Sequence, residues 1–299
     1  MVDLQRITFG YRRGERLFHR LDLALTPGNV YGLLGRNGAG KTTLLRLMAG
    51  LLFPKEGSAR VAGEEVRRRT PSFLRELYFV PEEFHTPALS PLALSRLYGV
   101  FYPRFDHAAM AGYLADLEVD AERSMTAMSY GQKKKVLLAF AVATRCRLLV
   151  LDEPTNGLDI PAKGQFRRLL AGAAADDRVI VVSTHQVRDL EHLIDPIVIL
   201  EQGRIVFQHS VEEISGALAV RDAAALGPPD DDTAIYVEPG AGIGGAAAGR
   251  AQVAAAGGEP LAEAAVDLEL LFNSVVADHG RVQAAFAGGA ASRAANQEA

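Results

Sequence analysis

One eight-residue stretch fits the phosphate-binding pattern G-x-x-x-x-G-K-[ST] at every fixed position, namely Gly35-Arg36-Asn37-Gly38-Ala39-Gly40-Lys41-Thr42. In this pattern, successive backbone N–H groups surround the phosphates of a nucleotide, and the glycines let the chain approach them closely. Lys41 then reaches the β- and γ-phosphates, and the Thr42 hydroxyl is placed to ligate Mg²⁺. The sequence therefore predicts a site for a nucleoside triphosphate.

Two apolar segments end in side chains that complement this loop. Residues 148–151 are typical of a strand covered on both faces and lead into Asp152 and Glu153. Residues 179–184 form a similar segment and lead into His185. Ligands of open α/β sheets bind beyond the carboxyl ends of the strands. We therefore expect Asp152 to hold the hydrated Mg²⁺, Glu153 to polarise the attacking water, and His185 to donate to the γ-phosphate.

The elements around the loop favour the same interpretation. Residues 29–34 are apolar and are predicted to form a buried strand that enters the loop. Residues 43–49 are predicted to form the first turns of a helix, whose N-terminus favours an anion. Strand, loop and helix together predict an α/β domain with its site at the carboxyl edge of the sheet.

In the order of these segments, the chain resembles the ATP-binding subunit of ATP-binding cassette (ABC) transporters, from about Leu4 to Phe207. Residues 128–132 read Met-Ser-Tyr-Gly-Gln where the family has L-S-G-G-Q, and residues 156–159 resemble its D-loop. The resemblance implies ATP and Mg²⁺ as ligands. It assigns ATP binding to Tyr11, Gly35, Arg36, Asn37, Gly38, Ala39, Gly40, Lys41, Thr42, Thr43, Ser129, Gly131, Gln132 and Asp159. It assigns catalysis to Glu153, His185 and Lys41, and the metal to Thr42, Asp152 and Glu82.

The signature segment distinguishes this family from other phosphate-loop ATPases. Ser129 resembles a helix N-cap, and the residues after Gln132 favour a helix. By resemblance, this helix end addresses the γ-phosphate held by another subunit. Two ATP molecules would then be enclosed in a head-to-tail dimer, which is either a homodimer or a heterodimer.

The chain departs from the family at two positions. Glu82 stands where the family usually has a glutamine that ligates Mg²⁺, with Glu83 as an alternative occupant of the position. A carboxylate also ligates a hard cation but adds negative charge near the phosphates. Tyr130 replaces the first glycine of the signature.

The implied fold is α/β, with a P-loop NTPase core of ABC-ATPase type. It comprises a mixed sheet with flanking helices, an antiparallel N-terminal β part, an inserted helical subdomain and a small C-terminal accessory region. We place the nucleotide-binding domain at residues 1–210 with its helical subdomain at about 70–128. The accessory domain follows at 211–280, and residues 281–299 are expected to be disordered.

Four aromatic residues in the expected helical subdomain have two interpretations, namely Tyr98, Phe101, Tyr102 and Phe105. Core packing is the simpler one. By resemblance, they would instead line the groove that receives a helix of the membrane subunit.

Composition limits the other functions. The net charge of −4 gives no reason to expect nucleic acid as a partner, and Lys133-Lys134-Lys135 is interpreted as a solvated helical face. The single cysteine, Cys146, excludes an intrachain disulfide. No segment approaches the roughly 18 uninterrupted apolar residues of a membrane span. Any membrane role would therefore come through a partner chain, and the resemblance implies a permease subunit that holds the chain at the cytoplasmic face of the membrane.

Three functions remain after these observations. The first is the ATPase subunit of a transporter, with export favoured because residues 266–272 resemble a helix that closes many exporter-type subunits. The second is a soluble ABC-type mechanical ATPase acting on ribosomes or DNA, although the chain shows neither coiled-coil heptads nor a second phosphate loop. The third is a non-enzymatic nucleotide-binding module, which the presence of both Glu153 and His185 disfavours. The transported substrate is not predicted.

Overall fold

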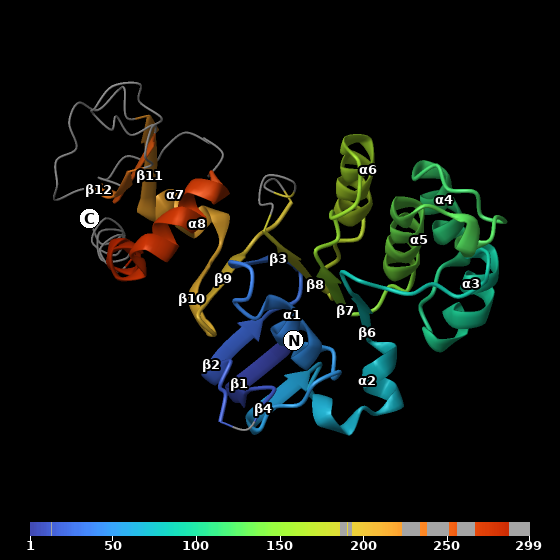
Figure 1. The fold of residues 1–299 in the computed structure, drawn as a ribbon, viewed down its shortest axis with the longest axis horizontal. Coiled ribbons are helices and arrows are strands. Elements are labelled where there is room, and N and C mark those ends of the chain that lie inside the picture. The colour runs from blue at the N-terminus through green and yellow to red at the C-terminus, as the bar shows by residue number, and fades with distance from the viewer. Residues whose placement is uncertain are drawn as a thin grey trace.

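The computed structural model describes residues 1–12, 14–185, 190, 193–222, 234–237, 251–255 and 267–286 (Figure 1). Two sheets meet at the centre of the molecule, helices lie to one side of them, and the C-terminal elements lie to the other. No helix among the described residues is long and apolar enough to cross a membrane.

The central sheet has six strands in the order β10-β9-β3-β8-β7-β6. Their bounds are β3 Asn29–Leu34, β6 Leu77–Val80, β7 Leu148–Asp152, β8 Val179–Thr184, β9 Ile197–Glu201 and β10 Arg204–His209. All neighbours are parallel except β10, which returns antiparallel to β9. Leu34 pairs with Thr184, and Asp152 pairs with Ser183. The register therefore brings the ends of β3, β7 and β8 to one edge, so the three predicted site segments begin side by side.

The second sheet is antiparallel and has the order β2-β1-β4-β5. Its strands are β1 Val2–Phe9, β2 Phe18–Leu25, β4 Glu56–Val61 and β5 Glu64–Glu65. Helix α1, Lys41–Met48, begins directly after the phosphate loop. Its buried residues, such as Leu44 and Met48, join one apolar cluster with residues of both sheets. This packing fixes α1, and therefore the loop before it, against the sheet edge.

A helical insert follows β6, which is an edge strand of the central sheet. Two short elements, η1 Val66–Arg68 and α2 Pro71–Arg75, precede β6. The short elements of the insert are η2 Gly99–Phe101 and η3 Met125–Ala127. The longer helices are α3 Pro91–Tyr98, α4 His107–Asp116, α5 Tyr130–Ala143 and, beyond β7, α6 Ile160–Ala171. The expected start of the insert at residue 70 needs correction, because β6 lies within the six-stranded sheet. The insert therefore begins after Val80.

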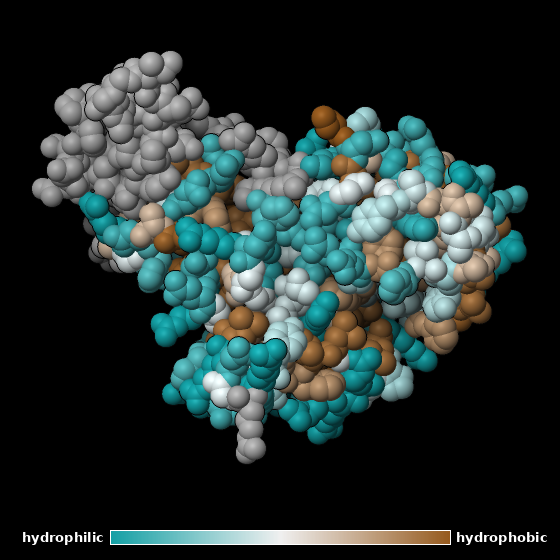
Figure 2. Space-filling model, in the orientation of Figure 1, coloured by the Kyte–Doolittle hydropathy of each residue, from teal (hydrophilic) through white to brown (hydrophobic). Residues whose placement is uncertain are grey.

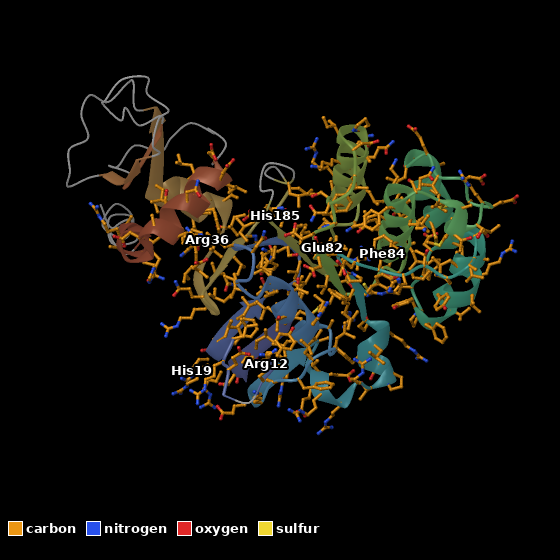
Figure 3. All side chains as sticks on the ribbon, viewed as in Figure 1. Arg12, His19, Arg36, Glu82, Phe84 and His185 are labelled. Atoms are coloured by element: carbon orange, nitrogen blue, oxygen red, sulfur yellow. The ribbon has the colours of Figure 1, made fainter. Side chains whose placement is uncertain are left out.

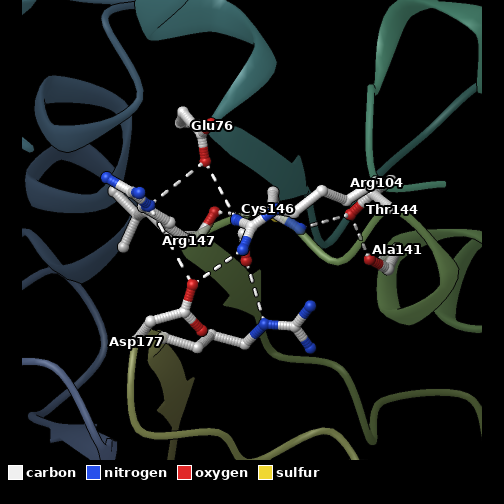
Figure 4. A network of polar contacts seen from close by, with 9 residues as sticks. Glu76, Arg104, Ala141, Thr144, Cys146, Arg147 and Asp177 are labelled. Carbon is white, nitrogen blue, oxygen red and sulfur yellow. Dashed lines mark hydrogen bonds and ion pairs between the residues drawn. The ribbon is translucent and has the colours of Figure 1, made fainter.

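An ion-pair network ties the insert to the amino edge of the central sheet (Figure 4). Arg104, between η2 and α4, places its two terminal nitrogens 2.7 Å from Asp177 Oδ2 and 3.0 Å from Glu76 Oε2. Arg147 Nε lies 3.7 Å from Glu76 Oε2. These side chains are partly exposed, so each pair adds little on its own. Because Arg104 contacts both Glu76 and Asp177, the network links the middle of the insert to two loops of the core.

The C-terminal elements follow β10, the strand at the other edge of the central sheet. They are α7 Val211–Ala217, β11 Leu218–Asp222, β12 Ala234–Val237, β13 Ala251–Ala255 and α8 Leu268–Ala277. Buried residues of α7 and α8, among them Ile214 and Leu271, belong to the apolar cluster that runs through the main domain. Over its described residues, the expected accessory domain is therefore continuous with that core.

The expectation of disorder from residue 281 is wrong for residues 281–286, which are helical. The ring of Phe286 stacks on His209 with centroids 4.0 Å apart and meets Phe207 edge-on. These aromatic contacts give the segment a reason to be ordered that composition does not reveal. Residues 287–299 and the glycine-rich stretch 240–245 lie outside the described residues.

Phe140 provides a test of the packing between the insert and the core. It lies on α5, is 2% exposed, and contacts the rings of Tyr78, Tyr102 and Phe105. We predict that Phe140→Ala lowers the free energy of unfolding by about 3–5 kcal/mol, because a large cavity is left. Phe101→Ala is the control, since Phe101 is 62% exposed and the change should stay within about 0.5 kcal/mol. Equal losses in denaturant titrations of the two variants would contradict this packing.

Candidate functional site

The phosphate loop joins the end of β3 to the start of α1. Gly40 occupies the N-cap position of α1 with φ 106°, a conformation that side chains disfavour. A Cβ there would also lie 2.9 Å from a ring carbon of Phe18. No side chain among the described residues caps α1. The N–H groups of its first turn are therefore left for an anion.

A cavity of about 620 Å³ opens in front of this loop. It is lined by Gly10, Tyr11, Glu15, Arg16, Leu17, Arg36, Asn37, Gly38, Gly40, Lys41, Thr42, Thr43, Glu82 and Glu153. Figure 3 shows Arg36, Glu82 and His185 near this edge of the central sheet. Gly35 and Ala39 are buried behind the lining residues. The volume and the lining suit a nucleotide.

Lys41 is folded back onto its own loop. Its Nζ donates to the carbonyl oxygens of Gly35 at 2.7 Å and Arg36 at 3.4 Å, and it lies 3.9 Å from Glu153 Oε1. Burial lowers the pKa of Lys41, while the nearby carboxylates of Glu153, Asp152 and Glu82 oppose that shift. An entering phosphate would offer this ammonium stronger, charged acceptors than the two carbonyls.

Asp152 and Glu153 follow β7 in different environments. Asp152 is buried, and its Oδ1 accepts a 2.6 Å hydrogen bond from Ser183 Oγ. Glu153 adopts φ 45°, and its backbone N–H donates to both oxygens of Ser183, at 3.2 Å to the carbonyl and 3.1 Å to Oγ. A left-handed backbone is uncommon for such a residue and turns its side chain away from the strand direction. The strained backbone therefore indicates that the orientation of the Glu153 side chain, which lines the cavity, is important for function.

The Glu153 carboxylate lies between two nitrogen groups. His185 Nδ1 is 2.8 Å from Glu153 Oε1, and the His185 backbone N–H donates to Oε2 at 3.4 Å. Lys41 approaches the same Oε1 atom from the phosphate loop. The Glu153 side chain is only 6% exposed but still lines the cavity. The structure thus brings together the three residues expected to act in catalysis.

Glu82 also faces the cavity, and two neighbours hold it. Its Oε1 accepts from Asn156 Nδ2 at 2.8 Å, and its carbonyl accepts from the Tyr130 hydroxyl at 2.7 Å. Thr42 lines the cavity as well, and Asp152 lies buried behind Glu153. Thr42, Asp152 and Glu82 thus offer hydroxyl and carboxylate oxygens, the donors that Mg²⁺ prefers.

Tyr11 stands at the mouth of the cavity. The residue is 59% exposed, its ring meets Phe9 edge-on, and its hydroxyl lies 2.9 Å from Thr43 Oγ1. The exposed ring is therefore oriented by two contacts and remains available for stacking. This is the arrangement that the resemblance to an adenine-stacking residue requires.

The signature residues lie elsewhere in the same chain. Ser129 caps α5, with Ser129 Oγ accepting from the Gln132 N–H and Gln132 Oε1 accepting from the Ser129 N–H. Asp159 caps α6 in a similar way. The described residues that line the cavity do not include Ser129, Gly131, Gln132 or Asp159. One copy of the chain therefore does not bring these four residues to its own phosphate loop.

Two contributors have no expected role in the sequence analysis, namely Ser183 and Lys134, while Asn156 enters it only as part of the D-loop resemblance. Ser183 has a visible signal, because a serine inside an otherwise apolar strand needs a polar partner. The expectation of a solvated face at Lys133-Lys134-Lys135 is wrong for Lys134, because its side chain is fully buried. Its spacing of four residues from buried Leu138 was the available signal.

Comparison with known proteins gives a consistent result. Residues 18–156 match the family described as ABC transporter. The cobalt import ATP-binding protein CbiO of Rhodobacter capsulatus is 31% identical over 242 residues, which cover 77% of the chain and 85% of that protein. The Nod factor export ATP-binding protein I of Burkholderia orbicola is 34% identical over 212 residues, covering 68% of each.

A longer relative and a solved structure extend the comparison. An ABC transporter ATP-binding protein of Streptomyces avermitilis is 36% identical over 223 residues, which cover 68% of the chain but only 37% of that protein. The solved structure of an ATP-binding subunit of an ABC transporter matches with a TM-score of 0.65 at 23% identity. It covers 72% of the chain and 91% of that structure. The expected α/β fold of ABC-ATPase type is confirmed.

Lys41 provides the test of the cavity as a triphosphate site. We predict that Lys41→Met weakens binding of a fluorescent ATP analogue by at least about tenfold, because one charge-assisted hydrogen bond is worth roughly 1.5–3 kcal/mol. Arg60→Met is the matched control, since Arg60 is exposed on β4 and does not line the cavity. Unchanged affinity of the Lys41 variant in an equilibrium titration would exclude this assignment.

Proposed function

Because the chain belongs to the ABC transporter family as an ATP-binding, ATP-hydrolysing subunit, we propose that it powers transport through a separate membrane subunit by ATP-driven closure of a dimer. One observation carries this proposal. The Glu153 carboxylate and the phosphate loop face one cavity. The first turn of the signature helix, α5, does not line that cavity in the same chain. A second copy, or a related subunit, would supply the missing helix end.

In this proposal, the chain's own residues prepare the hydrolytic step. The triphosphate takes the Lys41 ammonium from the carbonyl oxygens of its loop, so that the ammonium moves from Glu153 toward the phosphates. Glu153 then accepts a hydrogen bond from the water that attacks the γ-phosphorus. His185, already 2.8 Å from Glu153, donates toward the γ-phosphate and steadies the developing charge.

The metal of this site is proposed to be Mg²⁺. The protein offers few ligands of its own, which suits Mg²⁺, because this ion commonly keeps waters and binds substrate phosphates. Thr42 and Asp152 would hold it, with Glu82, whose Oε1 accepts from Asn156, as a further carboxylate. When bound, Mg²⁺ neutralises charge on the β- and γ-phosphates.

The signature helix acts in trans in this proposal. Ser129 and Gly131 lie at the first turn of α5, where backbone N–H groups and the helix dipole favour an anion. Asp159 lies at the start of α6 and would also face the other copy. Closure therefore depends on bound triphosphate, and hydrolysis would reopen the dimer.

A second hollow supports the proposed membrane partner. A groove of about 700 Å³ lies between α2 and α3, lined by residues that include Leu51, Leu74, Tyr98, Phe101 and Tyr102. Figure 2 shows apolar surface gathered beside α2. Single exposed apolar residues are common, but a contiguous patch of them indicates an interaction site. We infer that an amphipathic helix of the permease docks here, with this subunit at the cytoplasmic face of the membrane.

The direction of transport is proposed to be export. The support is the resemblance of residues 266–272 to the closing helix of exporter-type subunits, and α8 occupies that region. Both import and export appear among the names of similar proteins. A soluble mechanical ATPase acting on ribosomes or DNA is the alternative, and co-purification distinguishes the two.

Glu153 is the residue for the decisive kinetic test. We predict that Glu153→Gln lowers kcat for ATP by at least about 100-fold, as expected for loss of a general base, and that ATP then traps a dimer on size exclusion. Glu122→Gln removes a carboxylate from the exposed surface of the insert and should leave both readouts unchanged. Normal turnover by the Glu153 variant would overturn the proposed mechanism.

The groove allows a separate test. Phe101→Asp places a charge in the proposed apolar interface and should abolish co-purification with a membrane protein, while ATP turnover of the isolated subunit stays normal. His19→Asp changes an exposed residue on β2 and is the control. Retained co-purification of the Phe101 variant, or recovery of ribosomes or DNA by both proteins, would contradict a permease in this groove.

A further inference from the structure

Lys134 is a fully buried cation that the proposed chemistry does not use. It lies one turn into α5, and its side chain has 0% exposure. Burying an ammonium group is unfavourable unless it gains hydrogen bonds and charged neighbours. The two neighbouring lysines of the same run, Lys133 and Lys135, are only partly buried. The position of Lys134 therefore needs a specific explanation.

The Lys134 ammonium bridges two loops of the site. Its Nζ donates to the carbonyl oxygen of Glu153 at 3.0 Å and to that of Glu82 at 3.5 Å. These carbonyls follow β7 and β6, respectively. Burial lowers the pKa of Lys134, and the carboxylates of Glu82, Asp152 and Glu153 oppose that shift and favour the charged form.

Two aromatic rings close over this cation. Lys134 Nζ lies 5.8 Å from the ring centroid of Phe84 and 6.0 Å from that of Tyr130. The two rings stack on each other at 5.0 Å with an interplanar angle of 23°. Gly157 has room only for a hydrogen on this side, since a Cβ there would lie 2.7 Å from Tyr130 Cε1. The tyrosine that replaces a signature glycine thus shields the Lys134 ammonium from water.

The carbonyl that Lys134 holds belongs to the residue with the strained backbone. Glu153 adopts φ 45°, and its N–H and C=O are fixed by Ser183 and Lys134, respectively. The direction of the Glu153 carboxylate follows from this backbone. Removing either contact would let the peptide relax and turn the carboxylate away from the cavity.

We propose that Lys134 is a positioning residue for hydrolysis, which fixes the Glu153 main chain and couples it to the loop that carries Glu82. This inference rests on the proposed role of Glu153 as the base. It also gives the groove a route to the site, because His85 and Pro87 of the same loop line the groove.

The experiment compares Lys134→Gln, which keeps one donor group, with Lys134→Met, which keeps none. Lys133→Gln is the matched control, because Lys133 is adjacent to Lys134 in the chain, carries the same charge and is partly exposed. The measurements are kcat and KM for ATP, binding stoichiometry of a fluorescent ATP analogue, and the unfolding midpoint. We expect kcat to fall by about 100-fold for Met, as for a misplaced catalytic group, and by less for Gln. KM and stoichiometry should stay within about threefold of wild type, because Lys134 does not line the nucleotide cavity.

The following results would contradict the positioning role of Lys134. A wild-type kcat in both Lys134 variants would overturn the inference and leave the proposed function intact. A fall in kcat matched by a fall in binding stoichiometry, or failure of both variants to fold, would make Lys134 a structural residue and also overturn it. Wild-type protein that binds ATP but does not hydrolyse it would overturn both the function and this inference.

Discussion

The in-register parallel pairing of β3, β8 and β7 is the constraint on which the site depends. Because Leu34 pairs with Thr184 and Asp152 with Ser183, three segments far apart in the sequence start at one edge of the sheet. Only short segments beyond these strand ends are then needed to bring together the phosphate loop, the Asp152-Glu153 pair and His185. A slip of one residue would turn Asp152 to the opposite face and separate it from Ser183.

Two ammonium groups lie among three carboxylates at this edge before any nucleotide arrives. Lys41 and Lys134 are buried near Glu82, Asp152 and Glu153, and each lysine donates to carbonyl oxygens. The two lysines have different tasks. Lys41 faces the cavity and is free to change partners, whereas Lys134 is enclosed by aromatic rings and holds the main chain. The main chain of Glu153 is thus already fixed when the triphosphate binds beside its carboxylate.

Local patterns in the sequence were sufficient for much of this architecture. The phosphate loop, the strands ending in Asp152 and Thr184, and the Ser129 cap all follow from residue types at short spacing. What could not be predicted depends on contacts between distant segments. Lys134 looks like one of three solvated lysines until Phe84 and the two carbonyls are placed around it. Likewise, residues 281–286 become helical next to His209, which no local pattern indicates.

The central claim is that one chain holds the triphosphate and the base, while a second chain completes the site. The most direct measurement is specific ATPase activity over a wide range of protein concentrations at saturating ATP and Mg²⁺. If two copies are required, activity per subunit falls steeply on dilution and recovers with concentration, in step with the dimer detected by sedimentation. Activity that stays constant per subunit at concentrations where only single copies are detected would contradict the claim.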